Sequence, residues 1–292
     1  MTVNQGILLE MSDDSFFLVN CLKILKTHFE INLMKESTLN HTEAWVIALL
    51  LFVLMLLSCF VGKTVGNYIR SKKHTEEKPT ETSALTALLF LLLAFTFSMS
   101  TDRYDSRRKI VVEEANIIGT AILRSDLYPD STRTQFRNDF KQYVDARISY
   151  YTAGAEVKEV LKADSLSQII SLKLWKRAST LSKNPENLAA TQQMIPALND
   201  LIDVTTSRLS GEKAKVPQSI LIMLFFLAII TAFYNGYSEG RIGKMEWVVQ
   251  IGFCLLVSLV VLFTLDLDRP RRGFVNLDVP NQTIIDLRKN FE

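Results

Sequence analysis

The sequence is poor in the residues that build metal sites and disulfide frameworks. Its 292 residues contain only three cysteines and three histidines. The histidines, His28, His41 and His74, are far apart, and no two Cys or His residues have the spacing of metal ligands. Three cysteines are also too few for a disulfide framework. We therefore expect no bound metal ion, and nothing in the sequence predicts a cofactor.

Charge is missing from four long stretches, although 33 Lys and Arg and 31 Asp and Glu are spread over the rest of the chain. The uncharged stretches are 44–62, 82–101, 216–238 and 247–265. A helix needs about 20 apolar residues to cross the ~30 Å hydrocarbon core of a bilayer. The apolar residues are continuous and do not alternate, which excludes a β-barrel. The sequence thus predicts an all-α membrane protein with four transmembrane helices, held in a lipid bilayer.

The same absence of charge argues against catalysis or pumping inside the membrane. Proton-coupled transporters need an ionisable side chain within the bilayer. Intramembrane proteases need a nucleophile with a base, paired carboxylates or metal ligands. None of these lies in the four stretches, and a formal net charge of +2 gives no basic surplus for nucleic acid. We expect neither an enzyme nor a nucleic-acid-binding protein.

The chain divides into five predicted parts: an N-terminal segment, a membrane hairpin, a helical bundle, a second membrane hairpin and a tail. In this order the parts are 1–43, 44–101, 102–215, 216–265 and 266–292. A solvated polar link at 63–81 and a tight polar turn at 235–246 are expected within the two hairpins. The N-terminal segment stays open between an interfacial amphipathic helix, a flexible tail and a mis-assigned start whose true position is Met34.

The inserted bundle carries apolar side chains at helical spacing, which predicts about four packed amphipathic helices. Breaks between them are expected at Tyr128-Pro129, Gly154, Asn184-Pro185 and Ser210-Gly211. Asp130 and Ser131 are candidate caps after the first break, and Asn184 is one after the third. The expected core positions of the middle helices are Phe136, Phe140, Tyr143, Val144, Ile148, Leu161, Leu166, Ile169, Ile170 and Leu174.

Basic residues near the ends of the spans predict the orientation of the chain. Four spans place both termini and the bundle on one side of the membrane. Basic residues are somewhat more frequent on that side than in the two short loops. The positive-inside rule therefore favours a cytoplasmic bundle with cytoplasmic termini.

The second span has no helix breaker at its end, so one helix is expected to run from the membrane into the bundle as far as about Asp126. One face of this helix carries Ala87, Leu91, Phe95 and Met99. In a ring of identical subunits such a face could line a hydrophobic constriction that gates by dewetting. By spacing alone, lipid contact and core packing are the commoner explanation, with the basic residues that follow as a membrane anchor.

Several segments resemble the bestrophin-like family of bacterial membrane proteins of unknown function. The segments are LAFTFS at 93–98, RYDSRR at 103–108, EANIIGTAILRSDL at 114–127 and LDLDRP at 265–270 with Gly273. The resemblance covers about residues 44–285 and implies a bacterial inner-membrane protein. Its motif positions, for which we expect structural roles, are Tyr104, Asp105, Glu114, Asn116, Gly119, Thr120, Arg124, Asp268 and Pro270.

True bestrophins, to which this family is distantly similar, are pentameric ion channels with a hydrophobic neck on the second of four membrane helices. The resemblance therefore implies a homo-oligomer, a pentamer by analogy, that passes small inorganic ions. It places the pore neck on the face already described and an ion-attracting mouth, slightly favouring anions, just beyond it. The implied residues are Ala87, Leu91, Phe95 and Met99 for the neck and Arg103, Arg107 and Arg108 for the mouth.

Other features of these segments have plainer interpretations. Asp266 and Asp268 follow the fourth span as the acidic calcium clasp of bestrophins does, but two acids are too few for a calcium site. Gly119 predicts a close approach of helices at a subunit or bundle contact. A salt-bridged helix surface is expected at Glu113, Glu114, Arg124 and Asp126. A second hypothesis for the whole chain is a non-conducting membrane scaffold whose bundle binds a cytoplasmic partner.

Overall fold

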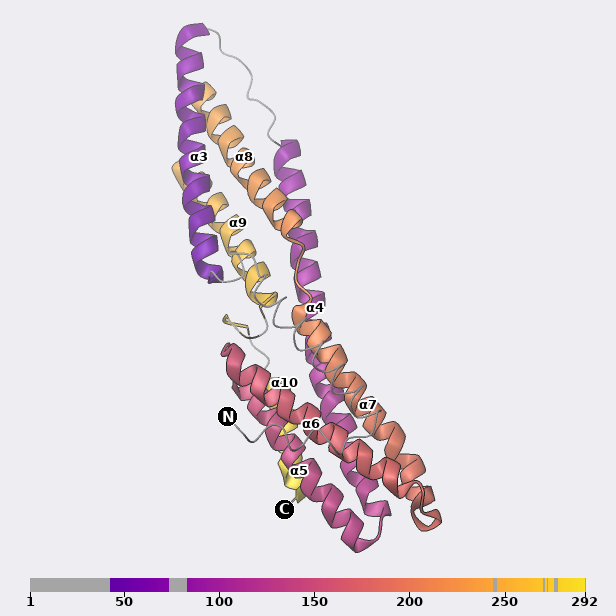
Figure 1. Cartoon of the computed structure of the whole chain (residues 1–292). Coiled ribbons are helices and arrows are strands. Elements are labelled where there is room, and N and C mark those ends of the chain that lie inside the picture. The colour runs from indigo at the N-terminus through magenta and orange to yellow at the C-terminus, as the bar shows by residue number, and fades with distance from the viewer. Residues whose placement is uncertain are drawn as a thin grey trace, which may run out of the picture. The chain divides into compact units, whose positions relative to one another are not determined.

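The computed structural model describes residues 43–73, 83–243, 246–269, 271, 273–275 and 278–291. Every regular element within these ranges is a helix (Figure 1). The chain divides into two compact units between Ile47 and Ala48, and the contacts described below lie within the second. The N-terminal residues 1–42, with their three interpretations, lie outside the described residues.

Four helices contain segments long and apolar enough to cross a membrane. They are α3 (Ala44–Lys73), α4 (Ser83–Arg124), α8 (Gln218–Ile242) and α9 (Trp247–Leu267). An α-helix satisfies its own backbone hydrogen bonds, which is why long apolar runs adopt it in lipid. The predicted all-α fold with four candidate spans is confirmed.

Two of these helices extend beyond their predicted ends. The link expected to begin at residue 63 is helical as far as Lys73. The turn expected at 235–246 begins only after Ile242, at Gly243, whose φ of +81° ends α8 in the left-handed conformation. Local propensity does not explain these extensions, because they contain Gly66, Asn67, Gly236 and Gly240. No proline interrupts them, and the two helix ends pack against each other there.

The extended ends of α3 and α8 cross at close range through facing glycines. A Cβ on Gly62 would overlap the carbonyl oxygen of Phe233, and a Cβ on Gly236 would overlap that of Cys59. Gly66 and Gly240, one turn further along each helix, also face backbone atoms of the other helix. Paired small-xxx-small segments let two backbones approach in this way.

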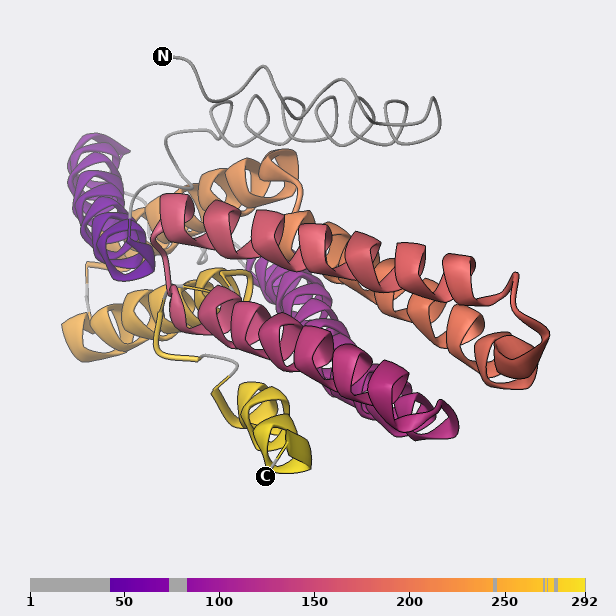
Figure 2. The same ribbon diagram turned by 60° about the horizontal axis from the view of Figure 1, so that its bottom comes forward.

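The remaining helices form the bundle beside the second half of α4. They are α5 (Asp130–Thr152), α6 (Val157–Leu181), α7 (Leu188–Lys213) and α10 (Asp278–Asp286), with 3-10 turns η1 (Ser125–Leu127), η2 (Pro185–Asn187) and η3 (Leu287–Phe291). α4 packs along α7, α5 along α6 and α6 along α7, and α10 lies against α4 and α5 (Figure 2).

The core of the bundle agrees with most of the predicted positions. All five expected residues of α5 are buried, as are Ile170 and Leu174 of α6. The predicted core positions of Leu166 and Ile169 are wrong, because both side chains lie on the outer face of α6, where Ile169 is 63% exposed. Periodicity alone could not separate them from Ile170 because α6 carries apolar side chains on more than one face.

The helix boundaries in the bundle follow three of the four predicted breaks. Asn184 caps the 3-10 turn after α6, and its side chain accepts a hydrogen bond of 3.1 Å from the Glu186 N–H. Pro129, and neither Asp130 nor Ser131, occupies the cap position of α5, and no side chain caps it. The break expected at Ser210-Gly211 is absent, since α7 continues to Lys213.

Candidate functional site: the face of α4 and the charged clusters beside it

Helix α4 joins the membrane part of the chain to the bundle without interruption. It has 42 residues from Ser83 to Arg124, close to the predicted end near Asp126. Its first half lies beside α8 and α9 and its second half beside α7 (Figure 1). A side chain in the membrane and one in the bundle can therefore share one continuous face of the same helix.

The predicted neck residues lie on the exposed side of α4. Leu91 is 53% exposed and Phe95 is 60% exposed, Ala87 is exposed and Met99 is half-buried. The opposite side, packed within the chain, is buried at Leu89, Leu93, Thr96 and Ser100. The structure thus brings Ala87, Leu91 and Phe95 together on one face that no other described part of the chain covers.

The three predicted mouth arginines are separated by the structure. Arg107 is only 4% exposed, and its guanidinium donates to three carbonyl oxygens: Gly211 at 3.0 Å, Ala214 at 2.6 Å and Leu267 at 3.0 Å. It thereby caps the ends of α7 and α9, whose last carbonyls lack helical partners. Arg107 is therefore a structural link and is not available at a pore mouth.

The other two arginines point in different directions. Arg103 is partly buried, lies 4.0 Å from Asp268 and donates weakly to the Met99 carbonyl at 3.5 Å. Arg108 is exposed. Successive residues of a helix lie about 100° apart, so 103, 107 and 108 cannot all share the face of Phe95.

The two acids at the C-terminal end of α9, Asp266 in its last turn and Asp268 at its C-cap, accept hydrogen bonds from nearby backbone N–H groups. Asp268 accepts the Val216 N–H at 2.8 Å and lies 3.8 Å from Arg107. Burial raises the pKa of Asp268 above its usual range, and Val216 and Arg107 only partly oppose that rise. Asp266 accepts the N–H groups of Phe274 and Val275, each within 3.0 Å.

Gly273 allows the backbone after α9 to pass close to the Asp266 carboxylate. Its φ is +113°, and an added Cβ would overlap the Asp266 carboxylate. Among the described residues no group of three or more His, Cys, Asp or Glu could hold a metal ion. Both acids of the LDLD segment accept backbone N–H groups. Pro270, the last motif residue, lies outside the described residues.

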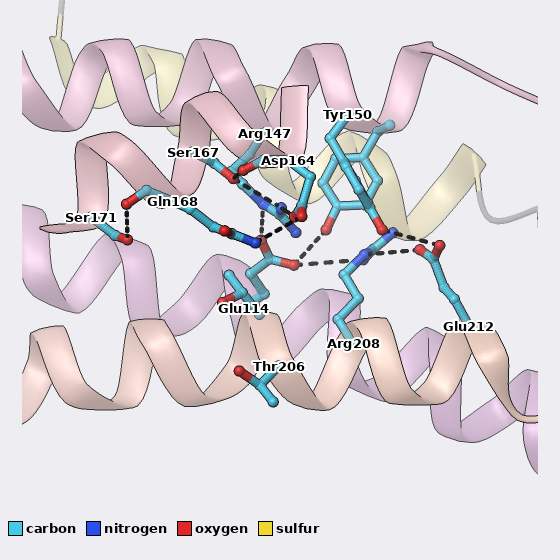
Figure 3. Close-up of polar contacts among 12 residues, drawn as sticks. Glu114, Arg147, Tyr150, Asp164, Ser167, Gln168, Ser171, Thr206, Arg208 and Glu212 are labelled. Carbon is cyan, nitrogen blue, oxygen red and sulfur yellow. Dashed lines mark hydrogen bonds and ion pairs between the residues drawn. The ribbon is translucent and has the colours of Figure 1, made fainter. Parts of the chain in front are cut away.

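Glu114 lies at the centre of a buried charged cluster (Figure 3). It is 0% exposed, accepts a hydrogen bond from Arg147 of α5 and one of 2.6 Å from the Tyr151 hydroxyl, and lies 3.6 Å from Arg208 of α7. The expectation that Glu114 belongs to a salt-bridged surface is wrong. It faces the interior because α4 turns this side toward α5 and α7.

The cluster extends through Glu212 to the segment after α9. Glu212 lies 3.3 Å from Arg208 and 3.0 Å from Arg271, and it accepts the Tyr150 hydroxyl at 3.0 Å. Arg271 also donates to the Tyr150 carbonyl at 3.1 Å. Burial and the nearby Glu212 raise the pKa of Tyr150 to about 12, so this hydroxyl stays a donor at neutral pH. The cluster ties four helices to the chain that leaves α9.

The remaining members of the cluster complete its balance of charge. Asp164 of α6 lies 3.8 Å from Arg147. Burial would lower the pKa of Arg147, but Glu114 holds it well above its ordinary value. Burial raises the pKa of Asp164. Buried charges are tolerated when each has an opposite partner and hydrogen bonds, as here.

Sequence reasoning missed the arginines of this cluster, although a signal for two of them was present. Arg147 follows Phe140, Tyr143 and Val144 at spacings of seven, four and three residues, so it lies on the apolar face of α5. A charged residue in phase with a core stripe indicates a buried partner. Arg208 carries the same signal, because it follows Leu201 and Val204 at spacings of seven and four residues, and Glu212 follows it by four. Arg271 carries no such signal because its partner Glu212 comes from a distant segment.

The other motif residues lie along the bundle half of α4. Tyr104 is half-buried and Asp105 is exposed. An added Cβ at Gly119 would meet only Leu287 Cδ2 at 3.6 Å, so the expected close helix approach is not found among the described residues of this chain. Arg124 donates to the Gln193 carbonyl at 2.6 Å.

Asn116 and Thr120 help to line a cavity of about 150 Å³ between α4 and α7. The other lining residues are Glu113, Ile117, Ala197 and Asp200. Glu113, Asn116 and Thr120 are themselves exposed, so the cavity opens on the outer side of α4.

A family profile described as the Bestrophin-like domain matches residues 45–279. The chain belongs to the bestrophin-like family. The resemblance that its motifs predicted is confirmed over most of the sequence. A comparison with curated proteins found no match.

This bestrophin-like chain is also similar to solved structures of a bacterial bestrophin homolog from Klebsiella pneumoniae. A single-substitution variant of that homolog superposes with a TM-score of 0.65 at 13% identity, covering 86% of this chain and 100% of the other. A second structure of the homolog gives 0.62 at 14% identity, covering 82% and 98%. At such low identity the likeness establishes the fold alone.

Proposed function

We propose that the protein is a homo-oligomeric channel that passes small ions along the exposed face of α4. The observation that carries the proposal is the apolar face of Ala87, Leu91 and Phe95, which no described part of the chain covers although the opposite side of α4 is packed. Apolar side chains converging around an axis make a constriction that gates by dewetting. Membership of the bestrophin-like family supports the same arrangement.

The oligomer and its placement are part of this proposal. A pentamer is favoured by the resemblance to bestrophins, and the positive-inside bias favours a cytoplasmic bundle and termini in a bacterial inner membrane. The anion preference expected from three arginines loses its basis, because Arg107 is buried and Arg103 is held near Asp268. We therefore propose the apolar neck on α4 without an ion-attracting mouth of three arginines.

Ion flux from liposomes containing the purified protein tests the proposal. Replacing Phe95 by Ala should widen and wet the constriction, so Phe95→Ala should conduct more than wild type. Phe226→Ala is the matched control, because Phe226 is an aromatic of α8 that is equally exposed, at 64%, and should conduct as wild type does. Folded, inserted protein that conducts in neither form would remove the channel from consideration.

A scaffold remains the second candidate, for one specific reason. Leu166 and Ile169 expose an apolar strip on the outer face of α6, away from the membrane helices. Such strips on soluble parts often contact another protein. Molecular mass in detergent separates the two functions, since a ring of five supports the channel and a monomer or dimer supports the scaffold.

A further inference from the structure

The carboxyl group of Asp268 lies where three segments of the chain meet, and it is incompletely hydrogen-bonded. Asp268 is the C-cap of α9 and is 7% exposed. Its Oδ2 accepts the Val216 N–H, in the connection from α7 to α8, at 2.8 Å. Its Oδ1 is buried, accepts no hydrogen bond from the described residues, and lies 3.8 Å from Arg107 and 4.0 Å from Arg103 of α4. Oδ1 therefore joins the end of α9 to α4 by charge alone.

The two arginines that face Oδ1 differ in how firmly they are held. The Arg107 side chain is 3% exposed, and three backbone carbonyls fix its guanidinium, so its position does not depend on Asp268. The Arg103 side chain is 23% exposed, and within its own helix it donates only a long hydrogen bond of 3.5 Å to the Met99 carbonyl. Asp268 is the carboxylate toward which Arg103 is drawn out of α4, so the position of Arg103 depends on the charge of Asp268.

Arg103 lies directly past the proposed neck. It follows Phe95 by eight residues and Met99 by four, so it lies about one helical turn beyond the last neck residue. Arg107 lies about one further turn along the helix. Polar contacts therefore hold this part of α4 to the end of α9 at two levels. Arg103 acts through charge, whereas Arg107 donates to the Leu267 carbonyl, a bond that remains whatever the charge of Asp268.

The surroundings of Asp268 make its charge sensitive to pH. Cations face it from two elements, Arg103 and Arg107 from α4 and Lys215 from the connection before α8. Glu212 of α7 lies near Arg107 and partly balances that charge. Burial nevertheless raises the pKa of Asp268 above its ordinary range, because these cations only partly compensate for the loss of water. A proton on Asp268 removes the attraction for Arg103, which keeps its own charge and is then repelled by Arg107.

We propose that the Arg103–Asp268 ion pair is a proton-dependent link between the helix that carries the neck and the end of α9. When Asp268 takes up a proton from water, the attraction between the two side chains is lost. Arg103 then turns from the junction toward the exposed side of α4, while Arg107 stays in place. The link itself requires no channel. Its effect on ion current, a less firmly held α4 and a wider neck in acid, rests on the proposed function.

A double-mutant cycle at two pH values tests the link directly. The melting temperature of the purified protein in detergent is compared for wild type, Arg103→Gln, Asp268→Asn and the double variant. At neutral pH the double variant should melt higher than the sum of the two single shifts predicts, because each single change already breaks the pair. At about pH 4, near the ordinary pKa of an aspartate, the two shifts should add, because Asp268 is then already uncharged.

Arg103→Gln combined with Glu159→Gln is the control cycle. Glu159 is an exposed acid of α6, and its shift should add to that of Arg103→Gln at both pH values. Two results would overturn the link: shifts of the Arg103 and Asp268 variants that add at neutral pH, or a departure from additivity that has the same size at both pH values.

Ion flux from liposomes separates the link from the proposed channel. In the Phe95→Ala background, which supplies current, lowering the pH over the same range should raise the flux several-fold. Adding Asp268→Asn should give the raised flux already at neutral pH and remove its pH dependence. A flux that ignores pH, in a protein whose cycle depends on pH, would overturn the effect on current and leave the channel standing. No flux from any folded, inserted variant, together with a pH-dependent cycle, would support the link and contradict the channel.

Discussion

Two regions of the molecule solve the problem of holding helices together by opposite means. In the membrane half, α3 and α8 meet backbone to backbone through glycines. In the bundle, α4, α5 and α7 meet through the buried charges around Glu114. The difference follows from the surroundings. In lipid the hydrophobic effect does not drive two helices together, because lipid tails are as apolar as the side chains, so close packing must drive helix association. In water, apolar burial supplies the stability, and paired charges select one arrangement of the helices.

The largest expected effect comes from removing one partner in the charged cluster. Glu114→Gln would leave Arg147 and Arg208 buried without their carboxylate, and we expect a loss of about 3–5 kcal/mol in the free energy of unfolding. Thermal unfolding of the purified protein in detergent measures it.

The residue next to Glu114 provides the control. Glu113→Gln alters an exposed acid and should change stability by less than about 0.5 kcal/mol. Equal destabilisation by the two variants would contradict the distinction drawn between the interior and the exposed face of α4.

A smaller effect is expected in the membrane half. Gly236→Ala places a Cβ against the Cys59 carbonyl oxygen, so α3 and α8 must separate, at a cost of about 1–3 kcal/mol. Gly252→Ala in α9 is the matched control: nothing lies within 4 Å of its added Cβ, and Ala favours the helix by about 1 kcal/mol. A melting temperature for Gly236→Ala at or above that of Gly252→Ala would show that the glycine contact does not hold these helices together.

The smallest effect concerns pH at the junction between the two regions. Burial raises the pKa of Asp268 in the folded protein, so the folded state binds its proton more readily than the unfolded state does. The contribution of Asp268 to stability should therefore increase as pH falls through its folded pKa, and decrease as pH rises through it.

Asp268→Asn cannot titrate and isolates this contribution. The difference in melting temperature between wild type and Asp268→Asn should move in favour of wild type as the pH is lowered from neutral toward the ordinary pKa of an aspartate. A difference that stays constant over this range would mean that Asp268 has an ordinary pKa in the folded protein.

The position of the membrane helices was predictable because it depends on composition over about 20 residues. Long uncharged runs have few alternatives in lipid. The continuity of α4 was predictable too, since no glycine or proline lies between Ser83 and Asp102 to end the helix. The ends of α3 and α8 were not, because their polar residues continue as helix beyond the apolar runs.

The burial and the partners of the charged residues could largely not be predicted from the sequence. Arg103, Arg107 and Arg108 are neighbours in the chain, yet only Arg108 is exposed. The Arg107 guanidinium donates hydrogen bonds to the carbonyls of Gly211 and Leu267, which lie more than one hundred residues away in the sequence. Nothing local to the RYDSRR segment could reveal those partners.

The sequence by itself determined that this is an all-α chain with four spans, one helix continuous from membrane to bundle and an apolar face at Ala87, Leu91 and Phe95. These features depend on local runs and on the 3.6-residue helical repeat. Only the tertiary structure decided that Glu114 is interior and that Arg107 caps two helices. Those outcomes depend on which distant backbone and side-chain groups desolvate each charge, a long-range property that no local pattern contains.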